Sequence, residues 1–77
     1  MNKKIRKKIF NISNRIEEII IDLEDIQEIE ESKLENIPDN LQNSALYMNI
    51  QDSLDIIIDA IEGLNEIIDN LEDLNTR

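Results

Sequence analysis

The chain has 77 residues, enough for one small domain, and it carries a net charge of −10 at pH 7. It contains no cysteine and no histidine, and its only aromatic side chains are Phe10 and Tyr47. The composition therefore excludes disulfide bonds, thiolate metal sites and acid–base catalysis by histidine. Most of its apolar residues are Ile and Leu, which is typical of packed helices rather than of ligand pockets.

Charge is distributed unevenly along the chain. The first 15 residues carry six basic side chains and no acidic one, whereas residues 16–77 carry 18 acidic side chains against Lys33 and Arg77. No apolar run is long enough for a signal peptide or a membrane span. We therefore expect a soluble, cytoplasmic protein that does not bind membranes.

A heptad repeat of isoleucine and leucine predicts a first helix over about residues 3–34. Its steps alternate between four and three residues, a period of 3.5 that no β-strand produces. Ile20 and Ile29 widen the apolar stripe, whereas Phe10 and Ile21 lie off it and should face solvent in an isolated hairpin. The repeat consists of Ile5, Ile9, Ile12, Ile16, Ile19, Leu23 and Ile26.

A polar hinge over about residues 35–43 interrupts this periodicity and holds the only proline of the chain. Pro38 disfavours helical geometry at Ile37 and suits the first turn of a new helix, so we expect a short turn there. Asn43 or Ser44 should then be the N-cap of the second helix. We expect three apolar residues to cover this end of the hairpin: Leu34, Ile37 and Leu41.

A second helix is predicted over about residues 44–75, with the same alternation of steps. Read in reverse, its repeat pairs with the first so that the two residue numbers always add up to 76 or 77. Antiparallel helices require such a constant sum, so the sequence predicts an all-α, coiled-coil-like helical hairpin as a single domain over residues 1–77. The second repeat consists of Tyr47, Ile50, Leu54, Ile57, Ile61, Leu64, Ile68 and Leu71.

The antiparallel arrangement brings the basic start of the first helix beside the acidic end of the second. We therefore expect ion pairs between the helices, with Lys3 and Arg6 beside Asp69 and Glu72. Exposed pairs contribute only about 0–1 kcal/mol each, so they would select the register more than stabilise it.

An acidic ridge runs along the second helix on the face opposite its repeat. Like charges at these steps of three and four residues repel each other by a few tenths of a kcal/mol per pair. The ridge is either a solvated surface or a docking surface for a basic site on another protein, and in its sharpest form it imitates nucleic-acid phosphates. It consists of Asp52, Asp55, Asp59, Glu62, Glu66, Asp69 and Asp73.

The apolar residues outnumber the positions that one hairpin seam can bury. A flank of the second helix is small or apolar without a counterpart on the first helix, and Gly63 in mid-helix costs about 1 kcal/mol relative to alanine. Such a flank favours close approach by another helix, so we expect a homodimer in which two hairpins form a four-helix bundle. The expected interface consists of Ile56, Ala60, Gly63 and Ile67.

The sequence offers no candidate catalytic, cofactor-binding or metal-binding residues. Carboxylates along the outside of a helix lack the buried or coupled environment that acid–base catalysis needs, and no calcium-loop pattern is present. The basic segment at residues 3–8 is a candidate for nucleic-acid contact, but the acidic remainder would repel phosphates. We therefore expect no enzymatic activity, no cofactor and no direct binding of nucleic acid.

The hinge resembles a known group of proteins. Residues 36–44 read N-I-P-D-N-L-Q-N-S. They resemble the N-x-P-x-x-L-Q-x-S hinge of small acidic two-helix proteins of Firmicutes and their phages and mobile elements. The resemblance covers the hinge and the second helix, with Leu34 where an aromatic residue is common. It implies a helical hairpin of bacterial or phage origin, hence a bacterial host cell, and no particular activity.

Three functions stay open from the sequence alone. The first is a small non-enzymatic protein–protein interaction module, for example a phage- or element-encoded inhibitor or regulator of a host protein. The second is an acidic mimic of nucleic acid that blocks a DNA- or RNA-binding enzyme. The third is a purely structural oligomerisation module.

Overall fold

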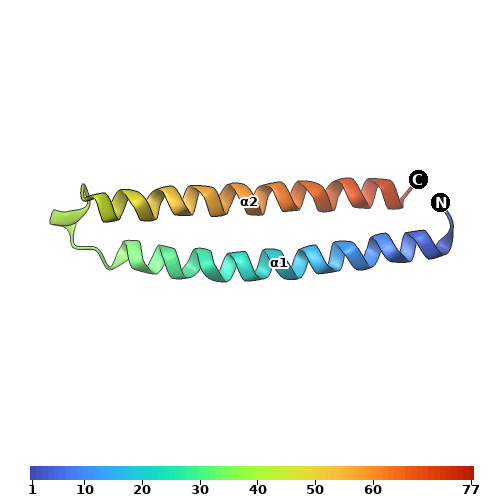
Figure 1. Ribbon diagram of the computed structural model, residues 1–77, viewed down its shortest axis with the longest axis horizontal. Helices are drawn as coiled ribbons and strands as arrows, with labels where there is room; N and C mark the ends of the chain where they lie inside the picture. The colour runs from blue at the N-terminus through green and yellow to red at the C-terminus, as the bar shows by residue number, and fades with distance from the viewer.

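The computed structural model describes all 77 residues and consists of two long helices joined by a short connection (Figure 1). Helix α1 spans Lys3–Glu35, the 3-10 turn η1 spans Asp39–Leu41 and helix α2 spans Ala45–Asn75. The two α-helices lie antiparallel and pack against each other, so both chain termini lie at the same end. The predicted all-α fold of two packed helices is confirmed.

Side-chain caps define the start of both helices. The Asn2 side-chain oxygen accepts a hydrogen bond from the backbone N–H of Ile5 at 2.9 Å. The Ser44 hydroxyl oxygen accepts one from the backbone N–H of Tyr47 at 3.2 Å, so Ser44, one of the two residues that the sequence indicated, is the N-cap. Each cap satisfies a backbone donor that has no partner inside its helix, an interaction that contributes about 1 kcal/mol.

The connection reverses the chain with ordinary backbone geometry, since no residue has a positive φ. The carbonyl oxygen of Pro38 accepts a hydrogen bond from the N–H of Leu41 at 2.9 Å, which closes the turn expected there. Leu34 and Ile37 are half-buried at this end of the hairpin, whereas Leu41 is exposed. The expected apolar cover therefore contains two of its three residues, and the prediction for Leu41 is wrong.

Helix α2 packs with the face that the sequence predicted. Ile50, Leu54 and Ile68 are only 7–8% exposed and belong to the core of the hairpin. The remaining members of the second repeat, Tyr47 included, are half-buried. The second repeat is therefore the seam of α2.

Helix α1 is rotated relative to the prediction. Ile9, Ile16 and Leu23 lie in its seam as expected, but the alternate members of the repeat face outward and are 38–50% exposed. The residues that follow these outward members point toward α2 in their place. The outward row consists of Ile5, Ile12, Ile19 and Ile26, and the inward row consists of Arg6, Ser13, Ile20 and Gln27.

The predicted alignment of the two helices is also wrong. It places Arg6 level with residues 70–71, whereas the Arg6 guanidinium donates a hydrogen bond to the carbonyl oxygen of Arg77 at 2.8 Å. The six or seven residues from that predicted level to Arg77 correspond to about 10 Å along a helix. The Arg6 side chain cannot span this distance, since it must also cross to the neighbouring helix. The connection determines the alignment. Helix α1 ends at Glu35 and α2 begins at Ala45, so the two helix ends are equally far from residue 40 and lie level with each other. This alignment displaces α2 by at least one turn from the prediction.

The expected ion pairs between the helices are not formed. The one ion pair joins Lys33 Nζ to Glu30 Oε1 at 2.9 Å, within α1. Lys3 is exposed, as are Asp69 and Glu72. The change of alignment accounts for this, because it moves the basic start of α1 toward the last residues of α2.

Two adjacent isoleucines test which face of α1 is buried. Because Ile20 is 7% exposed and Ile19 is 50% exposed, Ile20→Ala should lower the free energy of unfolding by at least about 2 kcal/mol, and Ile19→Ala by less than half of that. Urea denaturation followed by circular dichroism, at a protein concentration where the chain is monomeric, measures both. A larger loss for Ile19→Ala would support the seam predicted from the heptad repeat instead.

Candidate functional site

The acidic ridge lies on the side of α2 that faces away from α1. All seven of its residues are exposed. None of their carboxylates forms an ion pair or accepts a hydrogen bond from another side chain. The ridge is therefore a continuous row of negative charge with every carboxylate free to meet a partner.

The end of α2 strengthens the negative potential of the ridge. The last turn of α2 has no basic residue, and its unpaired carbonyl groups carry the negative end of the helix dipole. Asp69 and Asp73 lie near this end, where a positive charge would be favourable and a negative one is not. The helix dipole therefore adds to the negative potential of the ridge at Asp69 and Asp73, at the end of the hairpin where the basic start of α1 also lies.

The residues predicted as a dimer interface are uncovered in the single chain. Ile56 is 70% exposed, Ile67 is 45% exposed, and Ala60 is exposed as well. A β-carbon added at Gly63 would meet nothing within 4 Å, so the hairpin itself does not require a glycine there. These four residues are free to contact another molecule.

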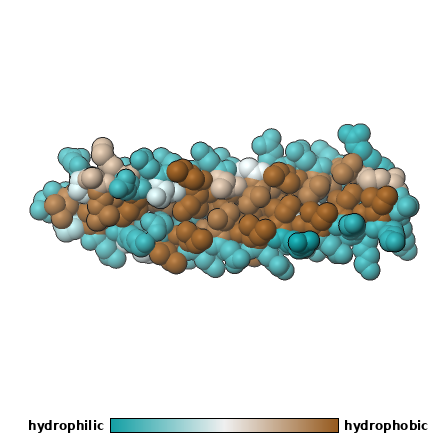
Figure 2. Space-filling model, viewed as in Figure 1, coloured by the Kyte–Doolittle hydropathy of each residue, from teal (hydrophilic) through white to brown (hydrophobic).

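The outward isoleucine row of α1 is a feature that the sequence analysis missed, because it assigned that row to the core. In an antiparallel pair of right-handed helices, flanks on the same rotational side of each seam lie on one face. The α1 row and the α2 flank that contains Ala60 are such a pair, and together we call them the apolar face. Figure 2 shows this face as a brown stripe along the molecule, bordered by teal. The apolar face consists of Ile5, Ile12, Ile19, Ile26, Leu46, Ala60, Ile67 and Leu74.

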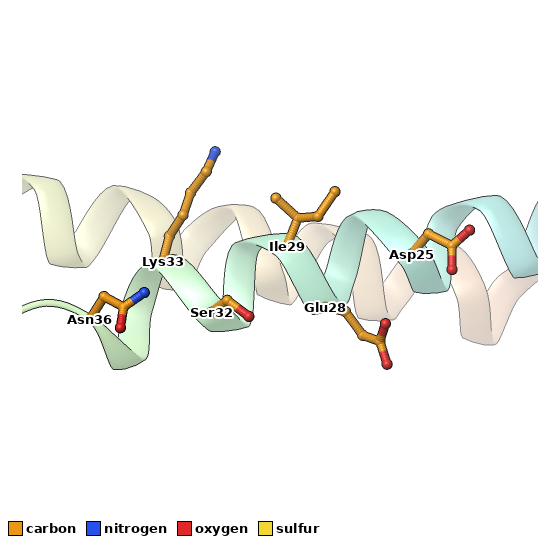
Figure 3. Close-up of a pocket in the computed structure, with 6 residues that line it drawn as sticks. All are labelled: Asp25, Glu28, Ile29, Ser32, Lys33 and Asn36. Carbon is orange, nitrogen blue, oxygen red and sulfur yellow. The ribbon is translucent and has the colours of Figure 1, made fainter.

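The structure has no cleft in which reactive side chains converge. The depression drawn in Figure 3 follows the outer surface of α1 and the residue after it, and Ile29 is its only apolar residue. The carboxylates of Asp25 and Glu28 point in different directions there (Figure 3). No group of three or more Asp and Glu side chains is placed to hold a metal ion. The depression is lined by Asp25, Glu28, Ile29, Ser32, Lys33 and Asn36.

Comparisons with known proteins do not assign this chain to a family. No family model, no curated protein and no solved structure gives a significant match to the chain. Neither helix contains a stretch long and apolar enough to cross a membrane. The candidate functional features are therefore the acidic ridge and the apolar face.

Repulsion between the carboxylates of the ridge should lower the free energy of unfolding by a measurable amount. Changing Asp59→Asn, Glu62→Gln and Glu66→Gln together removes four like-charged contacts at steps of three and four, each worth a few tenths of a kcal/mol. We expect the free energy of unfolding to rise by about 1 kcal/mol at low salt and the gain to vanish in molar salt, where charges are screened. Thermal melts followed by circular dichroism give both values, and a loss of stability at low salt would mean that these carboxylates are paired in solution.

Proposed function

We propose that this protein is a small non-enzymatic interaction module whose acidic ridge binds a basic surface on another protein. The observation that carries the proposal is the row of seven exposed carboxylates on α2, none of which is neutralised by the chain itself. A solvated surface helix commonly mixes both signs of charge, whereas this one keeps a single sign over its length. Concentrated charge of one sign attracts partners of the opposite charge and speeds their association.

The affinity of such a surface comes from several charges acting together. An exposed ion pair contributes only about 0–1 kcal/mol, so one or two contacts would not hold a partner. The ridge presents its carboxylates along one side of a straight helix, which lets several meet one complementary surface at once. Binding of this kind weakens strongly as salt concentration rises.

The hinge resembles that of small proteins from Firmicutes, phages and mobile elements, and this resemblance supports a role inside a bacterial cell. In that setting the chain acts in the cytoplasm of a bacterial host cell, as an inhibitor or regulator of a host protein. The module also forms a homodimer in this proposal, with two hairpins arranged as a four-helix bundle and with Ile56, Ala60, Gly63 and Ile67 near the contact. Without any other partner, the dimer alone would make the protein a structural oligomerisation module.

The spacing of the ridge favours a second candidate, an acidic mimic of nucleic acid. Seven carboxylates over residues 52–73 give about one negative charge per 5 Å of helix, at a rise of 1.5 Å per residue. One strand of DNA carries one charge per about 3.4 Å, so the two densities are comparable. A mimic would occupy the phosphate-binding groove of a DNA- or RNA-binding enzyme.

The triple variant of the ridge tests the proposed function when it is compared with a control variant that has the same net charge. Tagged wild-type protein should capture a host protein from bacterial lysate, and Asp59→Asn with Glu62→Gln and Glu66→Gln should abolish the capture. The control changes Asp25→Asn, Glu24→Gln and Glu28→Gln, three exposed residues of α1, and should retain the partner. Mass spectrometry of the captured fractions measures both, and equal loss in the two variants would show that net charge matters rather than the ridge.

Competition with nucleic acid separates the two candidates. If the ridge is a mimic, single- or double-stranded DNA or RNA should displace the chain from the captured partner in proportion to its own affinity. If the partner uses another basic surface, nucleic acid should leave the complex intact at the same ionic strength. Fluorescence anisotropy with the labelled chain measures the displacement directly.

A further inference from the structure

We propose that the apolar face is covered by a second copy of the same chain, with the hinges of the two copies at opposite ends of the dimer. The proposal rests on the homodimer proposed above and deepens it in two respects. It moves the centre of the contact from one flank of α2 to a surface built by both helices. It also fixes the relative direction of the two hairpins.

The surface of the single chain is too large for its mass. A folded monomer of 9.0 kDa is expected to expose about 4,850 Å², whereas this hairpin exposes 6,049 Å², an excess of about 1,200 Å². Its radius of gyration is 17.6 Å, against about 11.5 Å for a compact chain of the same length. A stable interface of standard size covers about 800 Å² on each partner. Covering one face of the hairpin with such an interface would therefore remove about two-thirds of the excess.

The composition of the apolar face fits the inside of a bundle. Helix α2 has three rows of mostly apolar positions per heptad, of which the hairpin seam covers two, and helix α1 keeps a row of four isoleucines outside the seam. Three such rows are typical of helices in a bundle, whereas a two-helix coiled coil needs only two. The outward row of α1 and the third row of α2 lie on the same face, and neither contains a charged residue except Lys33, at the hinge end of the α1 row.

A second copy is the occupant that matches this spacing. Within each row the side chains recur every seven residues, about 10 Å along the helix, from Ile5 to Ile26 on α1 and from Leu46 to Leu74 on α2. An occupant must carry apolar side chains at the same intervals over the same length. The chain itself does so, and a two-fold axis brings identical faces together with every contact made twice.

Charge along the hairpin sets the direction of the second copy. Residues 21–59, which form the hinge half, carry eleven acidic side chains against Lys33, a net charge of −10. The remaining residues carry seven acidic and seven basic side chains, a net charge of zero. Hinges at the same end would place the two segments of charge −10 about 10 Å apart, close to the Debye length of about 8 Å. Hinges at opposite ends place each of them beside a neutral half.

Variants of exposed isoleucines test which face is covered. The wild-type chain should have the mass of two chains at micromolar concentration by sedimentation equilibrium. Changing both Ile12→Glu and Ile19→Glu should raise the dimer dissociation constant at least about a hundredfold, since each tenfold step needs only 1.4 kcal/mol. The matched control Ile21→Glu alters an isoleucine that is 57% exposed on the opposite face and should leave the dimer intact. A wild-type mass of one chain, a dimeric double variant, or dissociation by Ile21→Glu would overturn the proposal.

A single spin label tests the direction without altering the apolar face. Because the chain has no cysteine, Asn40→Cys in the exposed hinge provides one labelling site per copy. Double electron–electron resonance spectroscopy should give a distance between the two spin labels that approaches the 60 Å length of the hairpin. Labels within about 20 Å, two helix spacings, would place the hinges side by side and overturn the orientation. This measurement remains decisive if the double glutamate variant does not fold.

Salt separates this proposal from the function of the ridge. The dimer should tighten as salt rises, because screening weakens the repulsion between two chains of charge −10 while the apolar contact persists. Capture of a basic partner by the ridge should weaken over the same range. The two readouts are independent, since neutralising the ridge should leave the dimer in place and Ile12→Glu with Ile19→Glu leaves the ridge intact.

Discussion

The whole structure depends on one apolar seam between two helices. Only five of 77 residues are buried, and all five are Ile or Leu in that seam. Isolated helices are marginally stable in water, and most helical stability in proteins comes from packing an apolar face. Here α1 and α2 depend on each other for that packing, since no third element exists to cover either helix. Apart from the half-buried members of the seam, most other side chains are exposed, and this leaves both the acidic ridge and the apolar face open to other molecules.

Local features of the fold could be predicted from the sequence. The Ser44 cap, the turn at Pro38 and the seam of α2 each depend on a few neighbouring residues and on helical periodicity. The position of the ridge followed from the seam of α2, because the two lie on opposite sides of the same helix. The alignment of the helices could not be predicted in this way, because a repeat with alternating steps of three and four residues looks nearly the same after a slide of one turn. The length of the connection between Glu35 and Ala45 decides the alignment instead.

The rotation of α1 has a related cause. This helix has three candidate rows for the seam, and one neighbouring helix covers only two of them. Periodicity favours the outward row, which has four isoleucines, whereas the structure buries the row of Ile20 and uses Ser13 and Gln27 beside it. Sequence reasoning therefore identified the exposed small and apolar residues of the α2 flank but missed the exposed isoleucine row of α1. The count of apolar rows on α2, three instead of two, is the signal that pointed to a further apolar surface beside the seam.

The antiparallel alignment also implies an order of folding. Residues that meet near the hinge are separated by a short stretch of chain, whereas Arg6 and Arg77, which meet at the open end, are 71 residues apart. The entropy lost on closing a loop grows with its length, so contacts near the hinge are the least costly to form first. The open end also holds two buried polar atoms without partners, Arg6 Nε and Asn75 Oδ1. We infer that the hairpin zips from the hinge outward and frays from its termini. Amide hydrogen exchange that is slowest next to the connection and fastest beside Arg6 would show this gradient, and uniform protection would contradict it.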